Sequence, residues 1–310
     1  MNEQVGGTMK HKPSILFVRV FLYIMIGLSQ LYPEKMYSQD NQNRFTDSTV
    51  VKSEGILSLR YTSDYYSMGR ADSAKAPYLS FSAGYYHKSG FFLNSSVYYL
   101  ISNEESRVDL YTVAGGYEYF SKKFATGISI KEFIFNKSSY VVTSELNTSL
   151  NAFAGYDFKI FTLFADASLG FSENTDVFLG LEINKTFRAL HRKMRITPSF
   201  YANAGSREVF SEYYTNRSRQ TGTVMGTGVN GHSQNPVALP VLKIEESNQF
   251  GILDYEAGLN VSYQVKNIRY FMLYTWTFPV NPSLIISDQD TYEEDLHNGF
   301  YWSAGIRLQI

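Results

Sequence analysis

The last eleven residues of the chain alternate between apolar side chains and side chains that are small or polar. The apolar set takes every second position: Phe300, Trp302, Ala304, Ile306, Leu308 and Ile310. The intervening set is Tyr301, Ser303, Gly305, Arg307 and Gln309. Successive side chains of a strand point to opposite faces, so this period of two predicts a β-strand with one apolar face. Such strands must pair side by side, and this requirement limits the folds that are open to the chain.

The same period recurs along the chain from Gly55 onward. Most of the alternating segments are about 9 to 14 residues long, which lets a tilted strand cross the hydrocarbon layer of a membrane, whereas soluble strands commonly have about 5 or 6 residues. The pattern predicts twelve strands, at residues 55–63, 77–87, 91–101, 108–120, 123–135, 143–158, 160–171, 176–188, 193–204, 253–266, 268–278 and 298–310.

The predicted links between strands are short on one side and mostly long on the other. Links after the even-numbered strands are short, and the longest link after an odd-numbered strand runs from Gly205 to Ile252. Transmembrane barrels have short periplasmic turns, longer outer loops and an even number of strands in bacterial single chains. The links therefore favour an all-β fold, a transmembrane antiparallel up-and-down β-barrel of about twelve strands. The short links are at residues 87–90, 121–123, 157–159, 189–192 and 266–267.

Outward-facing aromatic residues gather at both ends of the predicted strands. Aromatic rings settle at the two membrane interfaces of a barrel and flank an aliphatic band. A soluble barrel or sandwich, the alternative, would turn its apolar side chains inward and has no reason to sort aromatic residues to both ends. At the short-turn end we find Tyr117, Tyr119, Phe124, Tyr156, Phe158, Phe161, Phe187, Tyr263 and Tyr270. At the long-loop end we find Tyr99, Tyr111, Phe171, Trp276, Phe278, Phe300 and Trp302.

The N-terminus has the pattern of an export signal. A basic segment, residues 10–12, precedes an apolar run whose uninterrupted part after Arg19 is nine residues long. A spanning helix needs about 17 to 25 residues, so we interpret the run as part of a secretory signal peptide, with cleavage as late as residue 38 as an alternative. The chain then divides into a signal peptide at 1–29, a polar linker at 30–54 and the barrel at 55–310.

With these features the chain resembles bacterial outer-membrane β-barrel proteins. The resemblance covers residues 55–310 and concerns architecture, since no motif indicates a subfamily. The terminal residue is Ile310, where many such proteins have Phe, and the Tyr-, Asn- and Lys-rich composition is similar to that of barrels from Bacteroidota. The resemblance implies the outer membrane of a Gram-negative bacterium, contact with outer-membrane lipid and insertion by the barrel-assembly machinery.

The composition excludes several kinds of site. The chain has no cysteine, which excludes disulfides, thiolate metal clusters and a cysteine nucleophile. Its 28 Lys and Arg nearly cancel its 29 Asp and Glu, so no overall basic field would attract nucleic acid. The mean hydropathy of -0.22 excludes a helical membrane bundle but not a barrel, whose strands are apolar at alternate positions only. We predict no cofactor and no metal site.

The inward face of the predicted barrel carries charges of both signs. Because five basic residues cancel five acidic ones, we predict no strong ion selectivity. A basic wall on the first and last strands would face acidic residues across the lumen; the alternative is a set of buried ion pairs that satisfy a polar interior. The charged residues are Arg60, Lys131, Arg195, Arg269, Arg307, Glu118, Glu145, Asp166, Glu182 and Glu256. Inward aromatic residues would narrow the bore: Tyr78, Tyr86, Tyr98, Phe153, Phe164, Phe178 and Tyr201.

The outer loops hold the remaining candidates. Carboxylates are dense near the C-terminus, but their spacing lacks the glycine and regular alternation of an EF-hand, so a loop that faces water is favoured over a weak cation site. The same carboxylates with His297, and Asp254 nearby, would be the site of a hydrolase. The histidines of the predicted barrel lie in predicted links or, for His87, at the boundary between a strand and its link, so we assign no catalytic residue. The loop carboxylates are Asp288, Asp290, Glu293, Glu294 and Asp295.

The sequence leaves three functions open. The favoured function is a narrow gated channel for small polar solutes, with the link from Gly205 to Ile252 either folded inward as a constriction or extended outside. The first alternative is a non-catalytic structural or interaction barrel that binds a ligand or partner through its outer loops or periplasmic turns. The second is an outer-membrane hydrolase that uses the rim carboxylates and His297.

Overall fold

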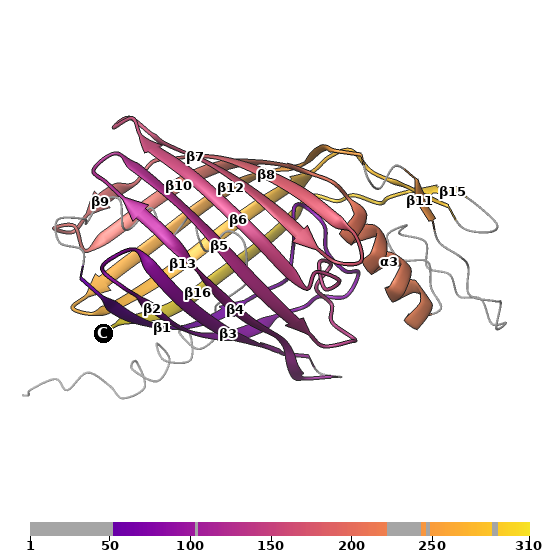
Figure 1. The fold of residues 1–310 in the computed structure, drawn as a ribbon, viewed down its shortest axis with the longest axis horizontal. Helices are drawn as coiled ribbons and strands as arrows, with labels where there is room; N and C mark the ends of the chain where they lie inside the picture. The colour runs from indigo at the N-terminus through magenta and orange to yellow at the C-terminus, as the bar shows by residue number, and fades with distance from the viewer. Residues whose placement is uncertain (1–51, 103–104, 222–242, 246–248, 287–290) are drawn as a thin grey trace, which may run out of the picture.

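The chain folds into a closed antiparallel barrel. The computed structural model describes residues 52–102, 105–221, 243–245, 249–286 and 291–310. The sheet runs β12-β13-β16-β1-β2-β3-β4-β5-β6-β7-β8-β10, and the pairing of β10 with β12 closes the ring (Figure 1). Apart from residues 52–54, the predicted signal peptide and linker lie outside the described residues.

The twelve predicted strands are confirmed. They are β1 (Glu54–Thr62), β2 (Tyr78–Tyr86), β3 (Phe91–Leu100), β4 (Arg107–Phe120), β5 (Phe124–Phe135), β6 (Thr148–Asp157), β7 (Thr162–Phe171), β8 (Thr175–Asn184), β10 (Met194–Gly205), β12 (Gly251–Val265), β13 (Ile268–Pro279) and β16 (Gly299–Gln309). The short strand β9 (Phe187–Ala189) continues the course of β8, because both pair with β10.

One predicted strand boundary is wrong. Strand β6 begins at Thr148 rather than at residue 143, so Glu145 lies in the preceding link and not on the inward face of a strand. Leu146, within the wrongly predicted part of the strand, is buried, as are Val141 and Val142 just before it. They pack into the barrel mouth from a link with turns, which explains why apolar residues occur there without a strand.

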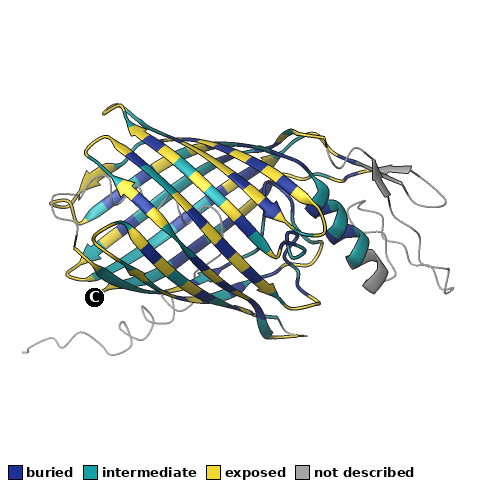
Figure 2. Cartoon of the chain, in the orientation of Figure 1, coloured by how far each residue is buried: buried dark blue, intermediate teal, exposed yellow. Residues whose placement is uncertain are grey.

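Burial alternates along each strand, as Figure 2 shows in bands of exposed and buried residues. In β8, Leu181 and Ile183 are about half exposed on the outer face, whereas Glu182 between them is 1% exposed. Apolar side chains outward and polar side chains inward are the reverse of a soluble barrel. A belt of this kind is stable only when lipid covers it, and it therefore identifies the strands as membrane-spanning.

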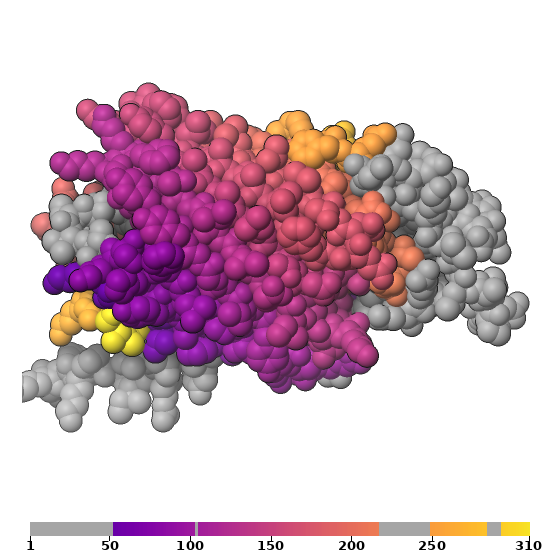
Figure 3. Space-filling view, viewed as in Figure 1, coloured from indigo at the N-terminus to yellow at the C-terminus, as the bar shows by residue number. Residues whose placement is uncertain are grey.

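The two predicted aromatic girdles are present on the outer face. At the short-turn end, the rings of Tyr156 and Phe158 meet at 4.7 Å and those of Phe158 and Phe161 at 5.0 Å. At the other end, the rings of Trp276 and Phe300 meet at 5.1 Å. Aromatic pairs at these distances are favourable in addition to the surface that they bury. The space-filling view shows the side chains of neighbouring strands forming a continuous outer surface (Figure 3).

The two ends of the barrel differ in their links. At the short-turn end, the backbone N–H of Gly55 donates to Ile310 at 3.0 Å, so the C-terminus lies beside the start of β1. At the opposite end stand the helix α3 (Glu208–Thr221) and a small sheet of β11 (Lys243–Glu245), β14 (Leu284–Ile286) and β15 (Thr291–Glu293) (Figure 1). No helix in the described part of the chain is long and apolar enough to cross a membrane.

Candidate functional site

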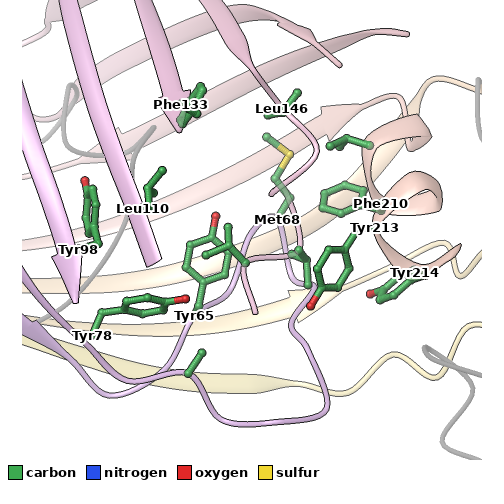
Figure 4. Packing of buried hydrophobic residues seen from close by; sticks show 14 of the residues in the cluster. Tyr65, Met68, Tyr78, Tyr98, Leu110, Phe133, Leu146, Phe210, Tyr213 and Tyr214 are labelled. Carbon is green, nitrogen blue, oxygen red and sulfur yellow. The ribbon is translucent and has the colours of Figure 1, made fainter. Parts of the chain in front are cut away.

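The outer end of the barrel interior is filled by an apolar cluster. Three links supply it: residues 63–77, residues 136–147 and α3. We call these three links the outer plug, and Figure 4 shows their side chains meeting strand residues across the mouth. Burial of apolar surface, worth roughly 25 cal/mol per Å², holds the links there. The buried members are Tyr65, Met68, Ala76, Tyr78, Tyr98, Leu100, Leu110, Phe133, Val141, Val142, Leu146, Phe178, Val209, Phe210, Tyr213, Tyr214 and Leu253.

Asp64 closes the base of the first link. Its Oδ1 accepts hydrogen bonds from the backbone N–H groups of Tyr65 and Ala76, both at 2.9 Å. Burial raises the pKa of the Asp64 carboxyl group, although these two hydrogen bonds and the nearby Lys75 oppose the rise. The carboxylate thus draws the two ends of the link together and turns the residues between them toward the mouth.

The tip of the first link is a tight turn that needs glycine. Ser67 and Arg70 exchange backbone hydrogen bonds of 2.8 and 2.9 Å around Met68 and Gly69, which both have positive φ. A Cβ atom on Gly69 would lie 2.7 Å from Cβ of Pro279 at the end of β13. Glycine therefore allows both the turn and the close contact with the barrel wall.

Arg70 joins the first link to two other segments. Its Nε donates to Oε1 of Glu294 at 2.8 Å and its Nη2 donates to Oε2 at 3.0 Å, with both side chains buried. The backbone N–H of Ser283 donates to the same carboxylate at 3.1 Å, and the Phe210 ring of α3 lies 5.3 Å from the guanidinium carbon. Burial, together with the nearby Glu294 charge, raises the pKa of Tyr214. A paired Arg–carboxylate contact of this kind fixes geometry as well as charge.

Asp176 at the start of β8 fixes the N-terminus of α3. Its Oδ1 accepts from the backbone N–H of Glu208 at 3.0 Å and its Oδ2 accepts from Val209 at 2.9 Å, while the Ser206 hydroxyl also donates to Oδ1. These bonds satisfy backbone donors that a helix leaves open in its first turn. Further along α3, the Tyr213 hydroxyl donates to Asp72 in the first link. The helix is thereby attached both to the barrel wall and to the rest of the plug.

Asp109 on β4 anchors the link 136–147. Its Oδ2 accepts hydrogen bonds from the Ser139 hydroxyl at 2.6 Å and from the Tyr78 hydroxyl, and its Oδ1 accepts from Nε of Arg107 at 3.0 Å. The guanidinium of Arg107 also lies 5.4 Å from the ring centre of Tyr140. A fully hydrogen-bonded carboxylate can be buried at low cost, so this network holds the link without breaking the apolar cluster.

Below the outer plug the inward face is mostly polar and partly open to solvent, with a small apolar cluster of Ala125 and Phe164 against Phe120 and Phe153. Asn94, Asn151 and Asn260 are only partly buried, and Asp166 in the middle of β7 is exposed. A Cβ atom on Gly180 would lie 2.4 Å from Oδ1 of Asp166, which shows that this carboxylate lies on the inward face. Solvent-accessible space therefore remains inside the barrel at this height. Buried hydroxyls line the same face: Ser58, Ser82, Ser96, Thr112, Ser129, Ser149, Ser168, Thr197, Ser262 and Thr275.

Nine of the ten predicted lumen charges lie at inward strand positions, with Glu145 the exception noted above. Arg269 and Arg307 are directly opposed on β13 and β16, and Nη2 of Arg269 donates to Gln264 at 2.8 Å. The guanidinium of Arg60 lies 5.1 Å from the ring centre of Phe271. Buried members are Arg60, Lys131, Arg195, Glu118, Glu182 and Glu256; Arg269 and Arg307 are partly buried.

The carboxylates of the predicted acidic loop do not share one environment. Asp288 and Asp290 lie outside the described residues, and Glu294 is bound to Arg70 rather than facing water. Among the described residues, no group of three or more His, Asp or Glu side chains could hold a metal ion.

Among the described residues, the structure brings together one pair of the alternative catalytic site, His297 with Asp295. Nδ1 of His297 lies 3.2 Å from Oδ1 of Asp295, and both side chains are exposed. Asp254 is buried, and it accepts hydrogen bonds from Asn203 at 2.6 Å and Thr277 at 2.9 Å. Asp254 and Glu294 thus have structural partners, whereas Asp295 contacts His297.

The sequence interpretation missed the residues that close the mouth. Helix α3 could have been found, because Val209, Phe210, Tyr213 and Tyr214 have the spacing of one helix face. No local signal pairs Arg70 with Glu294, which are separated by 224 positions.

Comparisons with known proteins give structural likenesses but no family. No family model matches the chain, and no curated protein sequence matches it. Similar solved structures include a KdgM porin, with a TM-score of 0.44 and 11% identity over 82% of this chain and 98% of that chain. LpxR from Salmonella typhimurium has a TM-score of 0.41 and 7% identity, over 82% of this chain and 99% of its own. An outer membrane channel from Pseudomonas putida F1 has 0.39 and 10%, over 84% and 96%. These likenesses concern the fold alone.

Proposed function

We propose that the protein is a gated channel for small polar solutes in the outer membrane of a Gram-negative bacterium. The observation that carries the proposal is the exposed Asp166 carboxylate, which lies on the inward face at the middle of the barrel wall. A barrel with a purely structural role needs no water-accessible space at this depth. The proposal implies insertion by the barrel-assembly machinery and contact of the apolar belt with outer-membrane lipid, and it includes no catalytic step.

The outer plug is the gate in this proposal. It consists of links and not of barrel strands, so it can move while the β-ladder stays intact. A few contacts between links hold it, among them the Arg70–Glu294 pair, the Tyr213–Asp72 hydrogen bond and the 3.0 Å contact between the hydroxyls of Tyr65 and Thr143. Displacing these links would join the polar lumen to the outside.

Planar-bilayer recording tests the proposal. The intact protein should conduct poorly, and replacing residues 67–75 by a Gly-Ser segment of equal length should raise the conductance several-fold. The matched control is the same replacement at residues 102–106, a link whose described residues supply no side chain to the apolar cluster. Heat-dependent gel mobility would show that both variants fold. A closed trace for the intact protein and for both variants would contradict the channel.

An interaction barrel is the second candidate. Helix α3 and the sheet β11-β14-β15 stand together at the outer end, where they could present a surface to an external partner (Figure 1). This candidate predicts that neither the intact protein nor the plug variant conducts. A plug variant that folds but does not conduct would therefore favour binding of a partner at this surface over the channel.

A further inference from the structure

Two pairs of arginines face each other across neighbouring strands of the barrel. Arg269 on β13 is directly opposite Arg307 on β16, and Arg188 on β9 is directly opposite Arg195 on β10. Directly opposed residues of an antiparallel pair share one face with Cβ atoms about 4.5 to 5.5 Å apart, and like charges in this arrangement are unfavourable. Both pairs lie near the short-turn end. The fold thus concentrates positive charge at a place where strand pairing alone disfavours it.

Strand β12 connects the two pairs into one surface. Arg195 is opposite Ser262, and Arg269 is opposite Gln264, two residues further along the same face of β12. Nη2 of Arg269 donates to Oε1 of Gln264 at 2.8 Å. Polar groups therefore fill the interval between the arginine pairs.

Arg60 on β1 extends this surface toward the outer end of the barrel. Its strand partner is Gly305, two residues above Arg307, and a Cβ atom there would lie 2.6 Å from Cζ of Phe271. The Phe271 ring uses the space that the glycine leaves and lies 5.1 Å from the Arg60 guanidinium. Arg60 is 9% exposed, and its Nε has no hydrogen-bond partner among the described residues. We call Arg60, Arg188, Arg195, Arg269 and Arg307 the arginine stripe.

Among the described residues of β1, β9, β10, β12, β13 and β16, the carboxylates lie away from the centre of the arginine stripe. Glu256 is six positions from Ser262 along β12, roughly 20 Å at the rise of a strand. Asp254 is bound by Asn203 and Thr277, as described above. Glu54 lies at the very start of β1, where Nε2 of Gln309 donates to it. The wall is therefore basic on the lower lumen side.

We propose that the arginine stripe binds an extended solute with repeated carboxylate or phosphate groups; this names the solute class of the proposed channel and rests on that function. Guanidinium groups form paired, charge-assisted hydrogen bonds with both kinds of anion. From β9 to β16 the stripe crosses four strand intervals, about 19 Å at the usual strand spacing. This length exceeds one small anion and matches a chain of charged groups.

Calorimetric binding to the refolded protein in detergent tests the stripe without requiring an open channel. The probes are tripolyphosphate and tetraglutamate, which separate phosphate from carboxylate recognition, with neutral maltotriose as the reference. At least one anionic probe should bind and maltotriose should not. Arg269→Gln with Arg307→Gln should weaken that binding at least about tenfold, since hydrogen bonds to charged groups are among the stronger ones.

The matched control is Lys131→Gln, which removes one inward positive charge from β5 on the other side of the ring. It should change binding less than the arginine variants. If the double variant does not fold, Arg188→Gln at the exposed rim of the stripe gives the same test. Equal weakening by Lys131→Gln, or no binding of either anion to the intact protein, would overturn the stripe. Conductance without anion binding would overturn the arginine stripe and leave the channel proposal standing. Anion binding without conductance would support the stripe and contradict the channel.

Discussion

The two halves of the barrel interior follow the same sequence pattern and have opposite character. At the outer end, inward side chains such as Tyr78, Tyr98 and Leu110 meet the outer plug and are at most 2% exposed. Lower down, inward positions such as Asn94, Asn151 and Asp166 remain in contact with solvent-accessible space. The difference comes from the links, because among the described residues the outer links carry the apolar side chains that fold back into the mouth. A strand's period therefore determines which face is inward, and at the outer end the links keep that face dry.

The largest expected effect comes from breaking the buried ion pair of the plug. Arg70→Gln should destabilise the docked plug by about 3 to 5 kcal/mol, because it leaves the Glu294 carboxylate buried without its counter-charge. Hydrogen exchange of residues 64–76 would measure the loss, while strand amides stay protected. Glu105→Gln, which removes the 60%-exposed partner of Arg107, should cost less than about 1 kcal/mol. Similar costs for the two variants would mean that the plug is not held as a dry unit.

Substitution of one phenylalanine in each half compares the apolar packing of the two halves of the barrel interior. Phe210→Ala should cost the docked plug about 3 to 5 kcal/mol, since a fully buried ring is removed and leaves a cavity. Phe271→Ala, at a partly exposed position of the lower lumen, should cost less. Urea unfolding in lipid vesicles, with exchange protection of α3 as a local probe, would compare them. A larger effect at Phe271 would reverse the assignment of dry and wet halves.

A third comparison uses neighbouring residues on the two faces of β8. Leu181→Arg places a charge in the apolar belt and should cost roughly 2 to 4 kcal/mol. Glu182→Gln should be mild because the amide oxygen can still accept the 2.9 Å hydrogen bond from Asn184. The same vesicle unfolding assay applies. Equal tolerance of the two changes would show that the inside and outside faces of β8 are misassigned.

The smallest expected effect is a pH dependence of the plug. Since burial raises the pKa of folded Asp64, its contribution to plug stability is fully present below the ordinary carboxyl pKa and is lost as the pH rises through the raised value. Plug opening should therefore be easier at neutral pH than under acidic conditions. Asp64→Asn should reduce this dependence in bilayer recordings made across that range.

A residual pH dependence is expected in Asp64→Asn, because burial also raises the pKa of Glu212 on α3. Adding Glu212→Gln should flatten the profile further. If the pH dependence of conductance were unchanged in the double variant, neither carboxylate would control plug opening.

Much of the fold was predictable from the sequence because period-two patterns and link lengths are local. They correctly predicted the twelve strands of the closed barrel and its outward aromatic residues. The outer plug was not predictable in the same way. Its stability depends on contacts such as Arg70 with Glu294 and Gly69 with Pro279, which join residues more than two hundred positions apart. Link 136–147 shows a limit of local patterns, since Leu146 lay in the predicted strand 143–158 but packs into the apolar cluster from a link.

The cross-strand arginine pairs were predictable from the sequence only in part. Arg195, Arg269 and Arg307 were expected on the inward face, whereas Arg188 was not among the predicted lumen charges although it lies within the predicted strand 176–188. The direct opposition of Arg269 with Arg307 depends on register, and a slip of one residue would have changed the face of either side chain. Only the paired strands establish that these arginines form one surface.

Thiol labelling of Asp166→Cys tests the central claim most directly, because the chain has no other cysteine. The variant would be placed in oriented vesicles, with Lys122→Cys in the β4–β5 turn as the marker of the short-turn side. A small membrane-impermeant reagent should label residue 166 from the short-turn side and not from the outer side. Adding Arg70→Gln should admit the reagent from both sides. Equal labelling from both sides of the otherwise intact barrel, or no labelling from either side, would contradict a wet lumen closed by an outer plug.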